Sequence, residues 1–205
     1  MNSNFKLIFI IRNPIERAWS AMRFLVSKGF KNINLEVKKN EILGFFGLVG
    51  AGRTELMESL FALREIKSGE FILNGREVEP ESPAQMIEQG LALIPEDRRS
   101  EGLVLNFSLK ENITLPNLKY FLKSKLLKHL DQEKEAEEAK NQVDQLDIKT
   151  PSIKQQVKYL SGGNQQKVVI SKWLYRKTQV FIFDEPTVGV DVGSRTEVYQ
   201  LINKL

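Results

Sequence analysis

The sequence has no cysteine and only one histidine in 205 residues. Without cysteine, disulfide bonds and cysteine-ligated metal centres are excluded. The single histidine, His129, follows Lys128 in a polar stretch, so we expect it on the solvated surface. These two shortages exclude metal centres that depend on thiolates or on several imidazoles.

Long apolar runs are also missing. The longest covers residues 7–11, far short of the ~18 residues that a bilayer-crossing helix needs. The N-terminus shows neither the charged-then-apolar pattern nor the small-residue cleavage site of a signal peptide. We therefore expect a cytoplasmic chain, which would work at a membrane only through other subunits.

The balance of residue types is ordinary for a globular protein, with 41% apolar and 27% charged residues. The length allows one substantial core and a small subdomain. The net charge of +4 and the pI of about 9.2 suit an anionic partner such as a nucleotide. Positive charge this small and dispersed does not argue for nucleic acid.

A glycine-rich loop lies between an expected buried strand at residues 42–47 and an expected helix at residues 54–63. Residues 47–54 follow the pattern G-x-x-x-x-G-K-[ST], except that Arg53 replaces the lysine. Such a loop presents backbone N–H groups and a helix N-terminus to phosphate oxygens, and the hydroxyl of Thr54 would ligate magnesium. The sequence thus predicts a phosphate-binding loop, with a purely structural turn as the alternative.

The arginine in this loop changes its chemistry. Lysine is a compact charge that fits between β- and γ-phosphates, whereas arginine is larger and planar. Arg53 will therefore not sit there in the same way, and we expect weakened or altered ATP handling.

Two acidic residues end a second buried strand at residues 179–183. Asp184 would hold magnesium, directly or through water, and Glu185 would polarise an attacking water. We expect the strands at 42–46 and 180–183 to lie side by side or one strand apart. That arrangement would bring the phosphate loop close to Asp184.

Taken in chain order, the glycine-rich loop, LSGGNQQK at residues 160–167 and VFIFDEPT at residues 180–187 resemble the nucleotide-binding domain of ABC transporter ATPases. The resemblance runs from about residue 28 to the last residue. It implies an α/β P-loop NTPase fold with a small antiparallel β portion and a helical subdomain at about 107–160. ABC domains work as head-to-tail pairs, with each ATP held between one domain's phosphate loop and the other's LSGG.

The resemblance also implies ATP and Mg²⁺ as cofactors. Glu185 would be the catalytic residue, and Thr54 and Asp184 the metal ligands. The nucleotide would contact residues of both motifs, namely Gly47, Gly50, Ala51, Gly52, Arg53, Thr54, Glu55, Ser161, Gly162, Gly163 and Gln165.

Other positions depart from the family pattern. Glu55 stands where ABC proteins usually carry a second hydroxyl near the α-phosphate, and its carboxylate would repel the nucleotide. Glu96 stands where the family has a glutamine that touches magnesium and communicates with the membrane subunits. Phe24 and Phe30 are candidates for stacking on adenine, with core packing as the alternative for each. The family's γ-phosphate-reading histidine would lie beyond Leu205, so we expect a truncated domain that is inactive when isolated.

Five segments resemble one subgroup, the second ATPase half of the tandem ATP-binding subunits of bacterial sugar importers of the ribose and galactoside type: GLVGAGRTEL, PEDRRSEGLV, SLKENITLP, LSGGNQQKV and DEPTVGVDVG. Purine-nucleoside importers are close relatives. An arginine-bearing loop is normal for that half. The resemblance implies that residues 161–163 serve a competent site in trans, whereas Arg53, Thr54 and Glu185 belong to a degenerate one.

The implied partners are a second ABC ATPase domain, membrane permease subunits and, indirectly, a periplasmic solute-binding protein. The implied location is the cytoplasmic face of the membrane, and Asp191 sits where the paired domains cross. A nucleotide-binding or dimerisation module that does not hydrolyse ATP, but completes a partner's site, is the alternative. The subgroup motifs disfavour a soluble ABC ATPase of translation or DNA repair.

Residues 1–26 break this pattern, ahead of an ABC domain expected at 27–205. We expect a strand at 5–11 and, after Asn13 and Pro14, a helix through 15–24. KLIFIIRNPIERAWSAMRF resembles the sulfotransferase segment that holds the 3'-phosphate of the sulfate donor, with Arg12 and Ser20 at the phosphate contacts. We interpret residues 1–26 as a foreign segment, one whose origin differs from that of the rest of the chain, for example through gene fusion. The alternatives are an ordinary strand and helix packed on the rest, or a sulfotransferase.

Two further segments carry local signals. Asn74 and Gly75 lie between the segments 70–73 and 76–78 and predict a β-hairpin. Residues 119–146, rich in Lys, Glu and Leu, predict a charged helix pair with a narrow apolar stripe. We interpret it as a solvated face over a small subdomain core, with a partner surface as the alternative.

Overall fold

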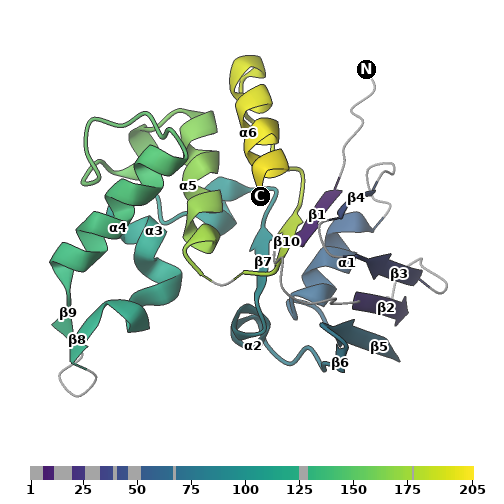
Figure 1. Cartoon of the computed structure of the whole chain (residues 1–205). Coiled ribbons are helices and arrows are strands. Elements are labelled where there is room, and N and C mark those ends of the chain that lie inside the picture. Colours follow the sequence, from purple (N-terminus) through teal and green to yellow (C-terminus); the bar gives the residue numbers. More distant parts are fainter. Residues whose placement is uncertain are drawn as a thin grey trace. The chain divides into compact units, whose positions relative to one another are not determined.

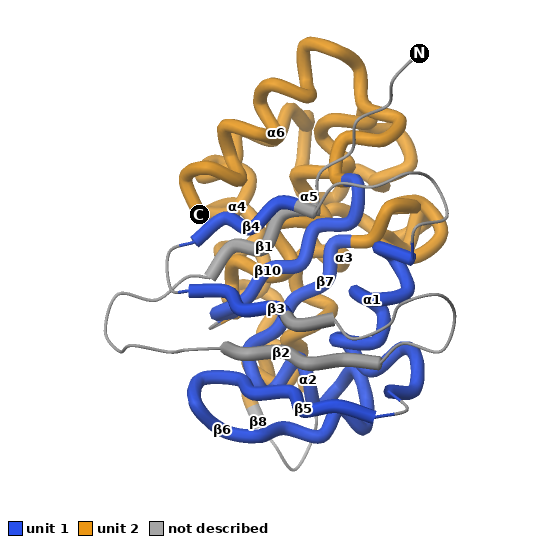
Figure 2. The backbone as a smooth tube through the Cα atoms, turned by 90° about the vertical axis from the view of Figure 1, so that its right-hand side faces the viewer, with its two compact units in different colours: residues 1–94, 178–185 blue, residues 95–177, 186–205 orange. Residues whose placement is uncertain are grey.

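The computed structural model of the chain describes residues 7–11, 20–25, 33–38, 41–45, 52–66, 68–124, 129–176 and 178–205 (Figure 1). It divides into two compact units, coloured blue and orange in Figure 2. Unit 1 consists of Met1–Ile94 and Thr178–Glu185, and unit 2 of Pro95–Lys177 and Pro186–Leu205. Each unit is thus formed by two segments that are separate in the sequence.

The first sheet of unit 1 has the order β4-β1-β10-β7. Its strands are β4 (Ile42–Phe45), β1 (Leu7–Ile11), β10 (Val180–Phe183) and β7 (Leu91–Ile94). β10 and β7 are parallel, whereas β1 is antiparallel to both of its neighbours. The strand at the glycine-rich loop and the strand before Asp184 therefore lie one strand apart, as the sequence predicted.

The second sheet of unit 1 is antiparallel and has the order β3-β2-β5-β6. Its strands are β3 (Ile33–Val37), β2 (Ser20–Leu25), β5 (Ser68–Leu73) and β6 (Arg76–Glu77). β5 and β6 are joined at Asn74 and Gly75, whose φ angles are 54° and 75°. Two consecutive left-handed residues are typical of the tightest hairpin turn, so the predicted hairpin is confirmed.

The helix predicted for residues 15–24 is wrong over its C-terminal part. Residues 12–19 lie outside the described residues, but Ser20–Leu25 form strand β2. β2 pairs with β3 along one edge and with β5 along the other. Because both edges of its backbone are satisfied by neighbouring strands, sheet pairing outweighs a local helical pattern.

The N-terminal segment contributes strands to both sheets. β1 pairs with β4 and β10, and β2 with β3 and β5. These pairings match the alternative in which the segment packs on the rest, although as two strands. Its foreign origin stays a prediction. Of the two aromatic candidates for adenine, Phe24 lies in β2, and Phe30 lies outside the described residues.

The core of unit 1 is built around α1 (Arg53–Leu60) and α2 (Pro83–Glu88). Leu56, Met57 and Leu60 of α1 are buried at the i, i+1, i+4 spacing of one helix face. They join side chains from both sheets and from α2, including Val37, Phe71, Leu73, Met86, Leu91 and Ile182. Full burial of such side chains stabilises the fold by about 1.5–3 kcal/mol each, which holds the start of α1 against the sheet.

Unit 2 is mainly helical, and the helical subdomain expected at about 107–160 stays a prediction. In chain order its elements are η1 (Arg98–Gly102), α3 (Leu109–Thr114), η2 (Leu115–Phe121), β8 (Leu122–Ser124), β9 (His129–Leu130), α4 (Gln132–Gln145), η3 (Val157–Tyr159), α5 (Gly162–Leu174) and α6 (Val192–Lys204). Figure 1 shows α3 packed against both α4 and α5. No helix among the described residues is long and apolar enough to cross a membrane.

The helix pair predicted over residues 119–146 is only partly correct. A short hairpin, β8 and β9, interrupts it, and Leu122 pairs with Leu130 across the two strands. Leucines that would have formed a helical stripe thus face each other across a hairpin. α4 begins after Asp131, whose side chain accepts a hydrogen bond from the Lys134 backbone N–H at 3.2 Å. His129 is exposed, as expected.

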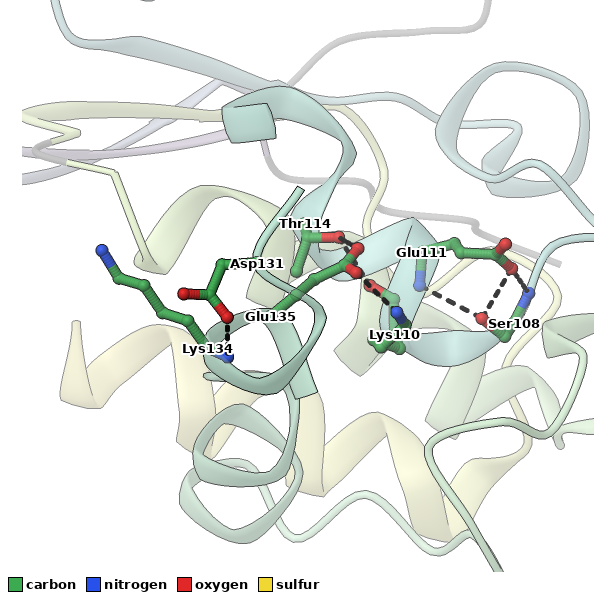
Figure 3. Close-up of polar contacts among 7 residues, drawn as sticks. All are labelled: Ser108, Lys110, Glu111, Thr114, Asp131, Lys134 and Glu135. Carbon is green, nitrogen blue, oxygen red and sulfur yellow. Dashed lines mark hydrogen bonds and ion pairs between the residues drawn. The ribbon is translucent and has the colours of Figure 1, made fainter. Parts of the chain in front are cut away.

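A buried carboxylate joins α3 to α4 (Figure 3). Glu135 of α4 is 4% exposed. It accepts hydrogen bonds from Lys110 Nζ at 2.5 Å and from Thr114 Oγ1 at 2.7 Å, both on α3. Ser108 and Glu111 form a reciprocal cap at the start of α3. The two bonds to Glu135 join α3 to α4, and the cap fixes the start of α3.

Candidate functional site

The end of β10 carries the two carboxylates that the sequence singled out. Asp184 is 4% exposed, and its backbone N–H donates to Ile94 O at 2.9 Å. Glu185 follows at a φ of 44°, a left-handed conformation that few glutamates adopt. The chain therefore turns sharply at the carboxyl end of β10, which is parallel to β7. Ligands of parallel α/β folds bind at the carboxyl ends of such strands.

The start of α1 has the geometry of an anion site. Gly52 is its N-cap, with a left-handed φ of 83° that favours glycine. The first-turn N–H groups of a helix lack partners within the helix, and they carry partial positive charge. Gly47, Gly50 and Ala51 lie outside the described residues. The described part of the predicted loop, residues 52–54, is therefore suited to binding an anion. Glu55 opposes this, because it adds a negative charge in the first turn of the helix.

Arg53 and Glu185 form an ion pair between α1 and the end of β10. Arg53 Nη2 lies 2.8 Å from Glu185 Oε1, and the two side chains are 13% and 11% exposed. The structure thus brings together two predicted site residues that are 132 positions apart in the chain. It does so by a direct contact that the sequence did not predict. The carboxylate expected to polarise water is held by the arginine expected to hold phosphate.

The magnesium assignment to Thr54 and Asp184 stays a prediction. Each is the sequence neighbour of one member of the Arg53–Glu185 pair, so both come from the same region of unit 1. The described residues contain no cluster of three or more His, Cys, Asp or Glu side chains that could hold a metal. A magnesium site does not need one, because Mg²⁺ is often held by one or two protein ligands, phosphates and water.

In unit 2, the LSGG segment forms the start of α5. Ser161 is the N-cap and is exposed. Its Oγ accepts from the backbone N–H of Asn164 at 3.4 Å and from Asn164 Nδ2 at 2.9 Å. The hydroxyl hydrogen of Ser161 can still be donated outward, and the helix N-terminus adds positive potential there.

The two glycines after Ser161 are packed within unit 2. A Cβ on Gly162 would lie 2.8 Å from Arg98 Nη2 and 2.8 Å from Gly189 O. A Cβ on Gly163 would lie 2.5 Å from the Cβ of Ser194. A glycine at position 162 lets the backbone approach a ligand closely. The structure adds a separate reason, because any larger residue would collide with the chain's own atoms.

Gln165, also predicted to contact nucleotide, is engaged inside unit 2. It is 4% exposed. Its Nε2 donates to Val157 O at 3.0 Å, and its Oε1 accepts from Arg98 Nε at 3.4 Å. Both polar ends of the side chain are thus used by the protein, and a direct nucleotide contact stays a prediction that these bonds do not support.

Arg98 was missed by sequence reasoning. It is 8% exposed, and burial lowers its pKa from the ordinary arginine value. Its guanidinium donates to Val188 O at 2.6 Å and to Gly189 O at 2.9 Å. The neighbouring Arg99 is exposed. Nothing in the sequence PEDRR distinguishes the two arginines, so only the fold reveals which one is buried.

Two acidic residues of unit 2 complete the predicted set. Asp191 is the N-cap of α6, and its Oδ1 accepts from the Ser194 backbone N–H at 3.0 Å. This hydrogen bond from the Ser194 backbone is the main reason why the pKa of Asp191 lies below its ordinary value. Glu96 is exposed. The roles that the resemblance implied for both residues stay predictions.

Comparison with known proteins gives one family. The sequence model described as ABC transporter matches residues 30–188. A ribose import ATP-binding protein, RbsA, of Bacillus cereus is 49% identical over 185 residues, which are 90% of this chain and 37% of that protein. A galactose/methyl galactoside import ATP-binding protein, MglA, of Clostridium tetani is 44% identical over 179 residues, covering 87% and 35%. The chain thus spans little more than a third of these relatives.

Solved structures agree on the fold. The ADP conformation of MJ1267, an ATP-binding cassette of an ABC transporter, is similar with a TM-score of 0.70 at 15% identity, covering 93% of this chain and 77% of that one. The dimeric post-hydrolysis state of the cassette MJ0796, bound to ADP and Pi, gives 0.64 at 18% identity, covering 91% and 82%. At such identities the likeness shows the fold alone, which is the P-loop fold expected from the sequence.

Proposed function

This chain belongs to the ABC transporter family, and from that premise we propose that it is an ATP-binding domain that powers the import of a sugar. Relatives named for ribose and for galactose or methyl galactoside import support the sugar class. We propose the second half of a tandem subunit, because Arg53 stands in the phosphate loop and the signature LSGG is intact. Its partners would be another ABC ATPase domain and permease subunits at the cytoplasmic face of the membrane.

The Arg53–Glu185 ion pair is the main observation for deciding whether the site beside Arg53 hydrolyses ATP or only binds it. A carboxylate that activates water must be able to accept a proton or orient the attacking water. One oxygen of Glu185 instead accepts from a guanidinium at 2.8 Å. That charge-assisted hydrogen bond competes with any water for the same carboxylate. We therefore propose that the pocket beside Arg53 holds nucleotide but contributes little hydrolysis.

Nucleotide binding beside Arg53 should be weaker than binding to a loop that carries the usual lysine. A phosphate that recruits Arg53 must compete with Glu185 for the same guanidinium. Glu55, in the first turn of α1, adds a second carboxylate close to the start of the helix. The start of α1 would still fit the phosphates of ATP, and Thr54 and Asp184 would hold Mg²⁺. ATP would supply the transferable phosphoryl group, and Mg²⁺ would neutralise charge on its phosphates.

The start of α5 would serve the other site of a head-to-tail pair. Ser161 presents a hydroxyl at a helix N-terminus, where negative charge is stabilised. Fixed donors directed at a developing charge can each be worth about 10² to 10³ in rate. A fold neighbour described as a dimer bound to ADP and Pi supports pairing of such cassettes.

Transport in proteoliposomes would test the import function. The chain, assembled with its second ATPase domain and permease, should drive ATP-dependent uptake of labelled ribose or galactoside. Uptake should stop with Ser161→Arg and persist with the exposed-site control Ser152→Arg, whose Oγ also accepts a backbone N–H, from Lys154. ATP-independent uptake, or no preference for either sugar over an unrelated amino acid, would contradict the proposal.

A further inference from the structure

The buried side chain of Arg98 connects three segments of unit 2. It begins η1, and it hydrogen-bonds to the loop at residues 188–189 and to α5. The two carbonyl contacts, at 2.6 and 2.9 Å, come from consecutive residues and occupy both ends of the guanidinium fork. The third contact, from Nε to Gln165 Oε1, is longer at 3.4 Å. Only arginine has donors arranged to make all three.

Two glycines make room for this side chain. A Cβ on Gly162 would lie 2.8 Å from Arg98 Nη2, and a Cβ on Gly189 would lie 3.3 Å from Nη1. Gly189 also has a φ of 65°, which disfavours other residues. The guanidinium therefore lies directly between the first residue of α5 and the 188–189 loop. Movement of either segment would break a hydrogen bond or cause a collision.

We propose that Arg98 is a positioning residue that fixes the N-terminus of α5, and with it Ser161, against the 188–189 loop. This inference rests on the proposed function, in which Ser161 acts on a partner's phosphate. Arg98 itself does not touch nucleotide in this arrangement. It acts through Gly162 and through the carbonyls of Val188 and Gly189.

The surroundings of Arg98 indicate that this residue fixes the arrangement of three segments rather than adding to the stability of the fold. A buried cation loses its hydration, and here its hydrogen-bond partners are neutral carbonyl and amide oxygens. A buried charge of this kind is weak evidence for net stabilisation. In return it holds three segments in one arrangement. Misplacement of a catalytic group by about 1 Å can cost ~10² in rate, so this constraint matters most for a site that must meet a partner.

Arg98→Lys is the variant that separates positioning from folding. Lysine keeps the charge and the stem, but its ammonium cannot bond to Val188 O, Gly189 O and Gln165 together. In the assembled transporter we expect kcat for ATP to fall ~10-fold or more, with KM nearly unchanged, because ATP is held mainly by the partner's phosphate loop. The control is Arg99→Lys, at the exposed neighbour, which should leave both constants unchanged.

Hydrogen exchange on the chain alone gives a readout that does not depend on transport. In Arg98→Lys, amides at the first turn of α5 and at residues 188–190 should exchange faster, by ~10-fold, while those of α4 stay unchanged. Arg99→Lys should match the wild type. A loss of protection throughout unit 2 would mean that Arg98 serves folding alone and would overturn the inference.

The two ways of failing are distinguishable. If the wild-type assembly hydrolyses no ATP, the proposed function fails, whereas local exchange at α5 still decides the role of Arg98. If the wild type is active and Arg98→Lys matches it in kcat and in exchange, the positioning role is wrong. A rise in KM with unchanged kcat would also overturn it, since that would place Arg98 in nucleotide binding.

Discussion

At the scale of single residues, the pairing of Arg53 with Glu185 decides how the proposed nucleotide site can work. Both side chains are largely shielded from solvent, so their attraction is less screened than that of a surface pair. Arginine can bond to carboxylate or to phosphate with the same fork. The pocket therefore contains an internal competitor for the anion that it is proposed to bind.

Removing the charge of Glu185 should tighten nucleotide binding. In Glu185→Gln, Arg53 loses this anionic partner and no longer has to be drawn away from it by phosphate. The affinity of the chain for a non-hydrolysable ATP analogue with Mg²⁺ should therefore rise ~3- to 10-fold, where tenfold corresponds to about 1.4 kcal/mol. A fluorescence titration measures this directly. The control, Glu58→Gln, removes an equal charge from α1 at a residue that pairs with Arg64 instead. Equal affinities for the two variants would show that the ion pair does not compete with phosphate.

Lys172 gives a residue-scale prediction about pH. It is 8% exposed, its Nζ donates to Gly102 O at 2.5 Å, and burial lowers its pKa from 10.5 to about 8. Between these values the unfolded chain binds more protons than the folded one, so stability rises with pH through this window. Below pH 8 the charge is present in both states, and its burial opposes folding.

The wild type should therefore gain stability relative to Lys172→Met as pH rises from 7 to 10.5. At ~1.4 kcal/mol per pKa unit, the difference in unfolding free energy should change by up to about 3 kcal/mol. Urea denaturation of both proteins at several pH values measures it, and groups common to both cancel. A difference that stays constant across the window would contradict the buried, depressed lysine.

At the scale of elements, Glu135 of α4 bonds to Lys110 and Thr114 of α3 (Figure 3). Glu135→Ala would leave Lys110 and Thr114 without their shared acceptor. We expect a loss of about 2–4 kcal/mol in unfolding free energy, near the lower end because Lys110 is 21% exposed and can regain water. Chemical denaturation should show this loss, whereas Glu137→Ala, at an exposed site of the same helix, should stay within about 0.5 kcal/mol. Equal stabilities would contradict the role of the buried carboxylate.

The elements also show where sequence reasoning succeeds. The hairpin at Asn74 and Gly75 and the helix after LSGG were predictable, because their signals are local: left-handed turn residues and an N-cap serine. The strand β10 was predictable from its short apolar run before Asp184. What could be predicted of the site was the identity of its motifs, since these also depend on a few adjacent residues.

The failures depend on distant partners. β2 is a strand because β3 and β5 lie on both of its sides, which no local pattern reveals. The ion pair of Arg53 with Glu185 joins positions 132 residues apart. The burial of Arg98 rather than Arg99 depends on the 188–189 loop and on α5. Each outcome is set by packing between segments that the sequence alone does not bring together.

At the scale of the whole molecule, the two units carry different parts of the proposed machinery. Unit 1 holds the start of α1 with Asp184 and Glu185, and unit 2 holds the start of α5 with Arg98. In a head-to-tail pair, unit 1 would receive one nucleotide and unit 2 would complete the site of the partner. One chain could then combine a weakly hydrolysing pocket with an essential signature segment.

The steady-state ATPase rate of the assembled transporter tests this division most directly. Ser161→Arg places a large cation at the exposed N-cap of α5 and should lower the rate at least ~10²-fold, the worth of one fixed donor to a developing charge. Glu185→Gln, in the pocket where Arg53 already holds the carboxylate, should retain the wild-type rate within a few fold. Ser152→Arg is the matched control and should be unchanged. If Glu185→Gln proves as inactive as Ser161→Arg, the division into one competent and one weakly hydrolysing site is contradicted.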